Sequence, residues 1–101
     1  MTSMSQSTKQ KWEFKLYIAG DAPNSRMAIV NLAEICQAYR LVDYDLEIID
    51  ILKVPLRAIQ DSILVTPTLL KLYPGLPCRI IGNLSDRKKV LQALELAGGT
   101  E

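Results

Sequence analysis

Residues 12–19 read Trp-Glu-Phe-Lys-Leu-Tyr-Ile-Ala, and this run is the clearest structural signal in the chain. Its alternation divides the side chains between two faces, one with Trp12, Phe14, Leu16 and Ile18 and the other with Glu13, Lys15 and Tyr17. A period of two is typical of a β-strand. Because Gly20 and Pro23 break the pattern, we expect the folded part of the chain to open with a strand that ends there.

A helix of about four turns is expected next, ending near Arg40. Asn24 or Ser25 can cap its start. Its apolar residues recur every three to four positions, as an amphipathic helix requires: Ala28, Ile29, Leu32, Ile35, Cys36 and Tyr39.

The middle of the chain predicts a second strand and a short helix. Residues 44–51 carry Ile and Leu on both faces, which indicates a strand buried on both sides of a layered sheet. Pro55 suits the first turn of a helix that extends to about Leu64, with Leu56, Ile59 and Ile63 as its apolar stripe. Residues 66–68, Thr-Pro-Thr, then end this helix.

The last third predicts a hairpin followed by a helix. Residues 68–73 and 78–81 are expected to be antiparallel strands joined by the turn Pro-Gly-Leu-Pro. Ser85 is the expected N-cap of the final helix, and Asp86 lies near its positive end. Apolar residues continue at helical spacing until Gly98-Gly99, where this helix is expected to end.

The element order is therefore strand, helix, strand, helix, strand, strand, helix. A right-handed crossover makes the first two strands parallel, and the hairpin makes the last two antiparallel. This βαβαββα order predicts a thioredoxin-like α/β fold, with one mixed sheet and helices on both faces. We expect residues 11–98 to form this domain, between a disordered tail of residues 1–10 and a flexible C-terminus of residues 99–101.

Length and composition restrict the function. The 101 residues leave room for one domain, and a net charge of +1 argues against binding to nucleic acid or an anionic membrane. The chain has no histidine, the commonest general base and zinc ligand. No secretory signal or membrane span is recognisable. We expect a cytoplasmic protein without cofactor or metal.

Thiol chemistry is the enzyme-class alternative, a thioredoxin-fold thiol enzyme or glutathione-binding domain that uses Cys36 or Cys78. Such enzymes need a reactive sulfur at the start of the first helix, where this chain has Asp-Ala-Pro-Asn-Ser. There is no Cys-x-x-Cys pair. Cys36 lies on an apolar stripe and Cys78 at a strand edge, so packing roles are favoured for both.

Three prolines are candidates for cis–trans isomerisation, and one group of charged residues is most simply explained by exposure to solvent. Pro67 stands where thioredoxin-like proteins place a cis-proline, and the spacing favours cis and trans equally. Pro74 and Pro77 are further isomerisation points. The charged residues of the short helix are interpreted as a solvated face: Lys53, Arg57 and Asp61.

Several blocks of the sequence together resemble the KaiB family of clock proteins. They occur in order over about residues 12–97: Lys-Leu-Tyr-Ile-Ala-Gly at 15–20, Pro-Asn-Ser at 23–25, Ile-Asp-Ile-Leu-Lys at 49–53 with Pro55, Ile-Leu-Val-Thr-Pro-Thr-Leu at 63–69, and Arg-Ile-Ile-Gly-Asn-Leu-Ser-Asp-Arg at 79–87 with Lys-Val-Leu at 89–91. The resemblance implies a non-enzymatic regulator of clock, timing or stress responses that binds the ring ATPase KaiC as a thioredoxin-like monomer. It also implies that the chain can adopt a second fold, with a rebuilt C-terminal half, that assembles as a tetramer.

From the resemblance we expect the second strand, the short helix and the loop between them to bind the partner. The residues expected to make this contact are Lys53, Pro55, Leu56, Arg57, Gln60 and Asp61. Charge reversal at Lys53 or Asp61 is then predicted to weaken binding with little effect on stability. A KaiB-like sensor domain of a histidine kinase system remains an alternative.

The chain departs from the cyanobacterial pattern in several places. Glu47 stands where a lysine is usual, the arginine after the Asn-Ser pair is displaced to Arg26, and the acidic C-terminal tail is missing. These differences weaken the expectation that the chain recruits KaiA and drives a daily oscillator. They favour a simpler two-component system.

The candidates for controlling the second fold are Pro67, Pro74, Pro77, Ala93 and Glu95. Family members that rest as tetramers usually have glycine and aspartate where this chain has Ala93 and Glu95. Alanine and glutamate both favour helix over those residues. The sequence therefore predicts a helix over residues 86–96 and a preference for the thioredoxin-like form.

Overall fold

The computed structural model of the chain describes residues 11–96. Its elements are β1 (Trp12–Ile18), α2 (Pro23–Ala38), β2 (Tyr44–Asp50), α3 (Pro55–Gln60), β3 (Thr68–Tyr73), β4 (Cys78–Ile81) and α4 (Arg87–Ala93). This order confirms the predicted βαβαββα fold. The expected tail of residues 1–10 and the flexible residues 99–101 lie outside the described residues, as does the expected helix end at Gly98-Gly99.

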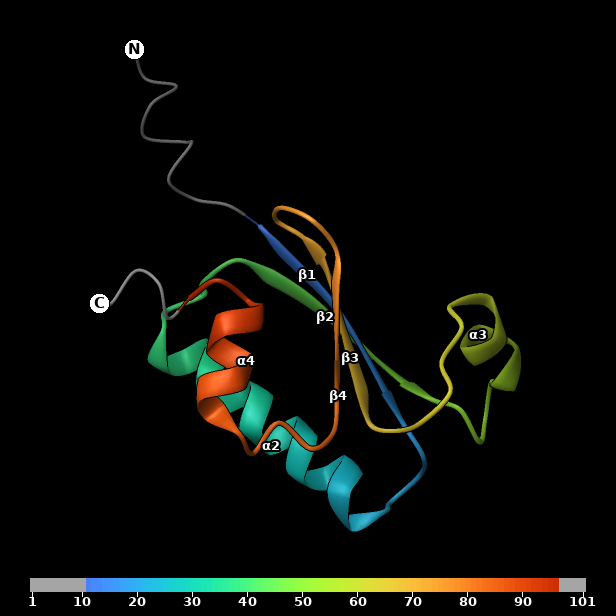
Figure 1. Cartoon of the computed structure of the whole chain (residues 1–101). Coiled ribbons are helices and arrows are strands. Elements are labelled where there is room, and N and C mark those ends of the chain that lie inside the picture. Colours follow the sequence, from blue (N-terminus) through green and yellow to red (C-terminus); the bar gives the residue numbers. More distant parts are fainter. Residues whose placement is uncertain (1–10, 97–101) are drawn as a thin grey trace.

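The four strands form one mixed sheet in the order β2-β1-β3-β4. β1 pairs in parallel with β2 and antiparallel with β3, and β3 pairs antiparallel with β4. Helices α2 and α4 cover one face of the sheet, and α3 lies alone on the other (Figure 1). The predicted crossover and hairpin are both confirmed.

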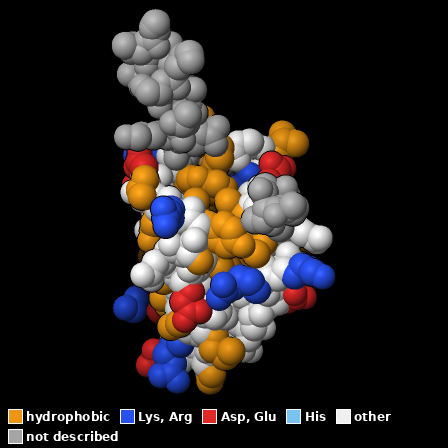
Figure 2. All heavy atoms as spheres, turned by 90° about the vertical axis from the view of Figure 1, so that its left-hand side faces the viewer, with side chains coloured by type: hydrophobic (Ala, Val, Ile, Leu, Met, Phe, Trp, Pro, Cys, Tyr) orange, Lys and Arg blue, Asp and Glu red, His pale blue; other side chains and the backbone are white. Residues whose placement is uncertain are grey.

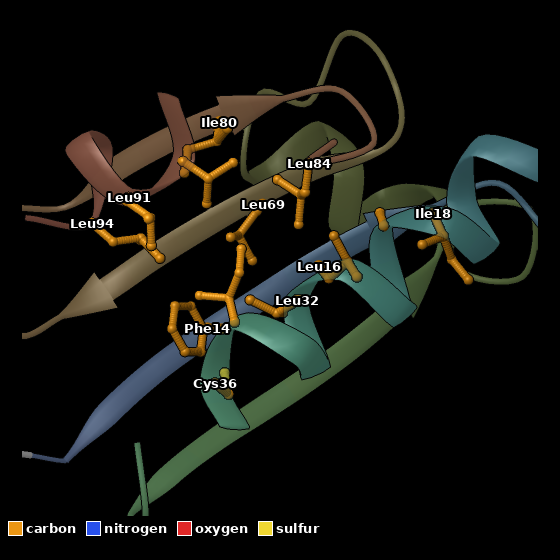
Figure 3. Close-up of a cluster of buried hydrophobic side chains, with 13 residues drawn as sticks. Phe14, Leu16, Ile18, Leu32, Cys36, Leu69, Ile80, Leu84, Leu91 and Leu94 are labelled. Carbon is orange, nitrogen blue, oxygen red and sulfur yellow. The ribbon is translucent and has the colours of Figure 1, made fainter. Parts of the chain in front are cut away.

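The larger core lies between the sheet and the pair α2 and α4. The alternation in β1 turns Phe14, Leu16 and Ile18 into this core, where they meet buried side chains of α2, β3, β4 and α4 (Figure 3). Leu32 and Leu69 are fully buried at its centre. The opposite face of β1 contributes Tyr17 to a smaller cluster under α3. The two faces expected from residues 12–19 are therefore confirmed.

The prediction that β2 is buried on both sides is wrong. β2 is an edge strand, and Ile49 is its one fully buried residue. Tyr44 and Ile48 remain exposed although they are apolar. A strand's position in the sheet depends on long-range pairing, which the composition of residues 44–51 does not encode.

Helix α3 begins at Pro55 as predicted, but the predicted N-caps of α2 and α4 are wrong. The N-cap of α2 is Ala22, and its side chain makes no capping bond. Ser25 is instead buried, where its Oγ accepts a hydrogen bond from the Ala19 amide at 3.1 Å. Asp86, rather than Ser85, caps α4, because its carboxylate accepts the Lys89 amide.

All three helices end in the same motif; α2 ends near Arg40 as predicted, whereas α3 and α4 end earlier than predicted. The residue two positions beyond each helix has a positive φ: Arg40, Ser62 and Glu95, at 56°, 56° and 63°. In α4, the Glu95 amide bonds to Gln92 and the Leu96 amide to Leu91, which is the Schellman pattern. Glycine usually occupies the positive-φ position, so its absence after α3 and α4 removes the usual sequence signal for a helix end there.

The turns around β3 contain two cis peptide bonds, Thr66–Pro67 and Tyr73–Pro74. In the hairpin after β3, the Lys71 ammonium is almost fully buried and donates a hydrogen bond to the Pro74 carbonyl at 2.5 Å. This bond satisfies a buried charge and ties the turn to the strand.

Candidate functional site

The loop between β2 and α3 is held against the end of β1 by Asp50. Its Oδ1 accepts the Gly20 amide at 2.9 Å and the Leu52 amide at 3.0 Å. The Gly20 hydrogen bond is the main cause that lowers the pKa of Asp50. Gly20 has φ +56°, and a Cβ there would lie 3.1 Å from Leu52 Cδ1, so glycine suits both the backbone and the contact. Asp50 therefore places the segment that leads into α3.

Exposed apolar side chains concentrate in residues 52–65, on and beside α3. We call this set the α3 apolar surface; it consists of Leu52, Val54, Leu56, Ile59, Leu64 and Val65. Leu56, Ile59 and Leu64 are exposed by 68%, 72% and 93%. A group of large exposed side chains of this kind is typical of a surface that another molecule covers.

The predicted apolar stripe of the short helix is wrong. Leu56 and Ile59 face solvent, while Ala58 is the buried residue of α3 and Ile63 packs beside it. Leu52, Ile59 and Leu64 are therefore candidate contact residues that the sequence pattern did not indicate. The available signal was an excess of apolar residues over what one short helix can bury.

The six expected contact residues divide into two groups. Lys53, Pro55, Leu56 and Gln60 are exposed around α3. Arg57 and Asp61 are partly buried and bonded to the sheet, so the interpretation of these two as a solvated face is wrong. Charge reversal at Asp61 is consequently not expected to leave stability unchanged.

Asp61 is the C-cap residue of α3 and connects the helix to β1. The Tyr17 hydroxyl donates a hydrogen bond to Asp61 Oδ2, and Lys15 Nζ lies 3.3 Å from the same oxygen. The Tyr17 hydroxyl is also 3.1 Å from the Arg57 carbonyl oxygen. Tyr17 is fully buried, so this contact joins the interior of the sheet to the end of α3.

Arg57 connects α3 to the edge strand β2. Its guanidinium forms a two-bond ion pair with Glu47, at 2.9 and 2.8 Å. Glu47 is the residue that departs from the family's usual lysine, and here its charge is matched to Arg57. Such planar paired geometry is stronger than an ordinary surface contact.

Arg79 connects the same region to β4. It donates to the Ser62 carbonyl at 2.9 Å and to the Asp61 carbonyl at 3.0 Å. These are carbonyls just past the end of α3, where a cation also complements the helix dipole. Side chains of β1, β2 and β4 thus all bond to residues 57–62.

The pKa values of this group follow from its contacts. Burial, together with the bond to Asp61, raises the pKa of Tyr17 to about 12. The Tyr17 hydrogen bond and the nearby Lys15 hold the pKa of Asp61 below its usual value. The Arg57 hydrogen bonds likewise lower the pKa of Glu47. The network therefore favours protonated Tyr17 beside charged Asp61 and Glu47.

Neither cysteine has the surroundings of a reactive thiol. Cys36 is buried in the larger core, and burial raises its pKa. Cys78 lines a hollow of about 270 Å³ with Lys71 and Arg79, but burial raises its pKa as well. A reactive cysteine needs a lowered pKa, so the geometry does not support the thiol-enzyme alternative.

Other site types find little support in residues 11–96. No group of three His, Cys, Asp or Glu residues in this part of the chain could hold a metal ion. No helix there is long and apolar enough to cross a membrane. On the face that carries α2 and α4, positive and negative side chains are interspersed (Figure 2).

Ala93 and Glu95 lie at the end of α4 rather than inside a longer helix. Ala93 is the last helical residue, and Glu95 has a left-handed backbone. The prediction of a continuous helix to residue 96 is therefore wrong. Helix propensity applies to Ala93 but not to Glu95, because a residue at positive φ is outside the helix.

Comparisons with known proteins agree on the family and the fold. The KaiB domain model matches residues 15–96. The circadian clock oscillator protein KaiB of Prochlorococcus marinus is 48% identical over 90 residues, which cover 89% of this chain and 77% of that protein.

Solved structures give the same fold. The N-terminal domain of Synechococcus elongatus SasA is 25% identical with a TM-score of 0.68, covering 84% of each chain. Mitochondrial thioredoxin 3 of Saccharomyces cerevisiae has a TM-score of 0.63 at 21% identity and covers 90% of this chain and 87% of that one, which shows the thioredoxin-like fold alone. The family match spans nearly all of the described domain, and the chain belongs to the KaiB family of non-enzymatic clock proteins.

Proposed function

We propose that this chain is a clock, timing or stress regulator that binds a KaiC-type ring ATPase through the α3 apolar surface. The observation that carries the proposal is the exposure of Leu52, Leu56, Ile59 and Leu64 in one segment. Interface centres are apolar and depleted of charge, with polar residues at their rim. Lys53 and Gln60 are suited to that rim, because both are exposed beside the apolar side chains.

In this proposal Lys53, Pro55, Leu56 and Gln60 contact the ATPase directly. Arg57 and Asp61 support these contact residues without touching the ATPase, because their charged groups already have partners on the sheet. The chain acts in the cytoplasm. Family membership supports clock-protein partners in general, and the departures from the cyanobacterial pattern at Glu47 and Arg26 weaken the expectation of KaiA as one of them.

We also propose that the chain can switch to a tetrameric second fold, with the thioredoxin-like form as its resting state. The segments that would be rebuilt include the turns at Pro67, Pro74 and Pro77 and the end of α4 at Ala93 and Glu95. The small size of β4 and α4, which span Cys78–Ile81 and Arg87–Ala93, supports this proposal. Short elements have few contacts to lose when a segment repacks.

The binding proposal is tested by size-exclusion chromatography of the purified chain with a KaiC-type ring ATPase. We expect the wild type to co-elute with the ring and Leu56→Ser to lose most of that co-elution. Leu76→Ser is the matched control, because Leu76 is also an exposed leucine, 83% accessible, but lies in the hairpin turn. Absence of wild-type co-elution, or equal losses in both variants, would refute the proposal.

The likeness to the SasA N-terminal domain favours a second candidate, a sensor domain of a histidine kinase system. Mass spectrometry of the protein from its native host separates the two. A mass near 11.3 kDa supports a free-standing regulator, whereas a longer chain with a kinase domain supports the second candidate.

A further inference from the structure

α3 is too short and too little buried to be held on the sheet by apolar packing alone. It contains six residues, and isolated helices of that length are unstable in water. Its one buried side chain is that of Ala58, which offers little apolar surface. Polar contacts therefore supplement the apolar packing of Ala58 and Ile63 in holding α3 on the sheet.

Those contacts converge on the C-terminal end of the helix. The Asp61 carboxylate bonds to Tyr17 and lies near Lys15 on β1, and the Asp61 carbonyl accepts from Arg79 on β4. Arg57 adds the contact to Glu47 on β2. Asp61 is the residue of this group that bonds to both the central strand and the far edge strand.

Some side chains of α3 face the sheet, and others face solvent. Ala58 and Asp61 face the sheet, while Leu56 and Ile59 are about 70% exposed on the same helix. The side chains of one short helix have fixed directions relative to one another. Holding Asp61 on the sheet therefore also holds Leu56 and Ile59 in their outward directions. A surface that is ordered before binding loses less conformational entropy on binding.

We propose that Asp61 is a positioning residue, whose carboxylate fixes α3 on the sheet and so preorganises the α3 apolar surface for its partner. The binding part of this inference rests on the proposed function. The anchoring part concerns the free protein and stands independently. Asp61 itself makes no contact with the partner in this arrangement.

The first test is amide hydrogen exchange in the free protein. Asp61→Ala is expected to speed exchange at Ser62 and Ile63 by 10-fold or more, because these amides bond to the Ile59 and Ala58 carbonyls of α3. Amides of β1 should keep their wild-type rates. Asp45→Ala is the matched control, since Asp45 also pairs with a lysine, Lys11, at 3.2 Å but lies away from α3. Unchanged exchange at Ser62 and Ile63 would overturn the proposal.

The second test is the titration of Tyr17, which a general loss of stability would not shift in the same way. Since Asp61 helps to raise the pKa of Tyr17, the phenol should titrate at lower pH in Asp61→Ala, as followed by NMR of labelled tyrosine. Tyr17→Phe identifies the signal and provides a milder second variant if Asp61→Ala does not fold. In that case, Tyr17→Phe should speed exchange at Ser62 and Ile63 by several-fold, and unchanged exchange would overturn the proposal.

The third test is binding to the ring ATPase. Asp61→Ala, or Tyr17→Phe if it replaces that variant, should weaken binding about 10-fold, while Asp45→Ala binds as the wild type does. Faster exchange with unaltered binding would overturn the role of Asp61 in preorganising the surface. If the wild-type protein does not bind at all, the proposed function is what fails, and exchange and the Tyr17 titration still decide the anchoring claim.

Discussion

The two faces of the sheet are built in different ways. On one face, α2 and α4 enclose a cluster of thirteen buried residues, nearly all of them apolar side chains that contact one another. On the other face, α3 covers a cluster of four, and ionic and hydrogen-bonded contacts hold the helix. The first face therefore buries most of the apolar surface that stabilises the fold, and the second leaves the apolar side chains exposed that we propose as the binding surface.

Helix length accounts for much of this difference. α2 has 16 residues and can bury a full apolar stripe, including Leu32 and Ile35. α3 has six and leaves Leu56 and Ile59 in solvent. Apolar side chains on a short helix remain available to a partner, whereas those on a long helix can be used for folding.

The largest effect should come from cutting into the larger core. Leu32→Ala should reduce the free energy of unfolding by about 2–5 kcal/mol, because it leaves a cavity at a fully buried site. Leu56→Ala should change it by less than about 0.5 kcal/mol, because Leu56 is exposed. Urea denaturation measures both values. Similar losses of unfolding free energy in the two variants would contradict the distinction between the two faces of the sheet.

The burial of Tyr17 on the α3 face, together with its bond to Asp61, should produce a stability change at high pH. Tyr17 has a pKa of about 12 in the folded protein, against about 10 when unfolded, so its contribution is complete below about pH 10 and is lost as pH rises toward 12. The loss should be roughly 1–3 kcal/mol, since one pKa unit corresponds to about 1.4 kcal/mol.

The measurement is urea denaturation between pH 9 and 12, a range chosen around the usual tyrosine pKa of about 10. Tyr17→Phe should remove this part of the pH dependence. Tyr73→Phe should retain it, because Tyr73 is 49% exposed. If the wild type and Tyr17→Phe have the same pH profile, the buried contact does not contribute in this way.

Two glycine substitutions at the end of α4 should have opposite and smaller effects. Ala93→Gly should destabilise the thioredoxin-like form by up to about 1 kcal/mol, because Ala93 is helical. Glu95→Gly should stabilise it by a similar amount or less, because Glu95 has φ 63°. Thermal unfolding measures both changes. In sedimentation, Ala93→Gly should also raise the tetramer fraction.

If both variants change the stability in the same direction, the result would contradict the helix end at Ala93. A tetrameric wild type at low concentration would contradict the proposed resting state.

The sequence predicted most of the fold because its strongest signals are local. The alternation of residues 12–19 specified both faces of β1, and the turn at residues 74–77 specified the hairpin. The exposure of Tyr44 and Ile48 was not predictable in this way, since it follows from the position of β2 at the sheet edge. The ends of α3 and α4 were missed because Ser62 and Glu95 occupy positions where glycine is the recognisable signal.

The contacts of the expected site residues could not be predicted from the sequence. The six expected contact residues lie in or beside α3, yet two of them, Arg57 and Asp61, form ion pairs with strand residues. Tyr17 and Arg79 bond to this region from strands far away in the sequence, which residue spacing along α3 cannot indicate. Periodicity likewise could not show that Ile59 faces solvent, because it does not reveal what covers a helix.

The most direct test of the two-face interpretation is isothermal titration of a KaiC-type ring ATPase with Ile59→Ser and Val30→Ser. Both residues are β-branched and exposed: Ile59 on α3 is 72% exposed, and Val30 on α2 is 53% exposed. We expect Ile59→Ser to weaken binding at least about 10-fold, which corresponds to about 1.4 kcal/mol, and Val30→Ser to bind within about twofold of the wild type. Equal losses, or a greater loss for Val30→Ser, would contradict the assignment of the α3 face as the binding surface.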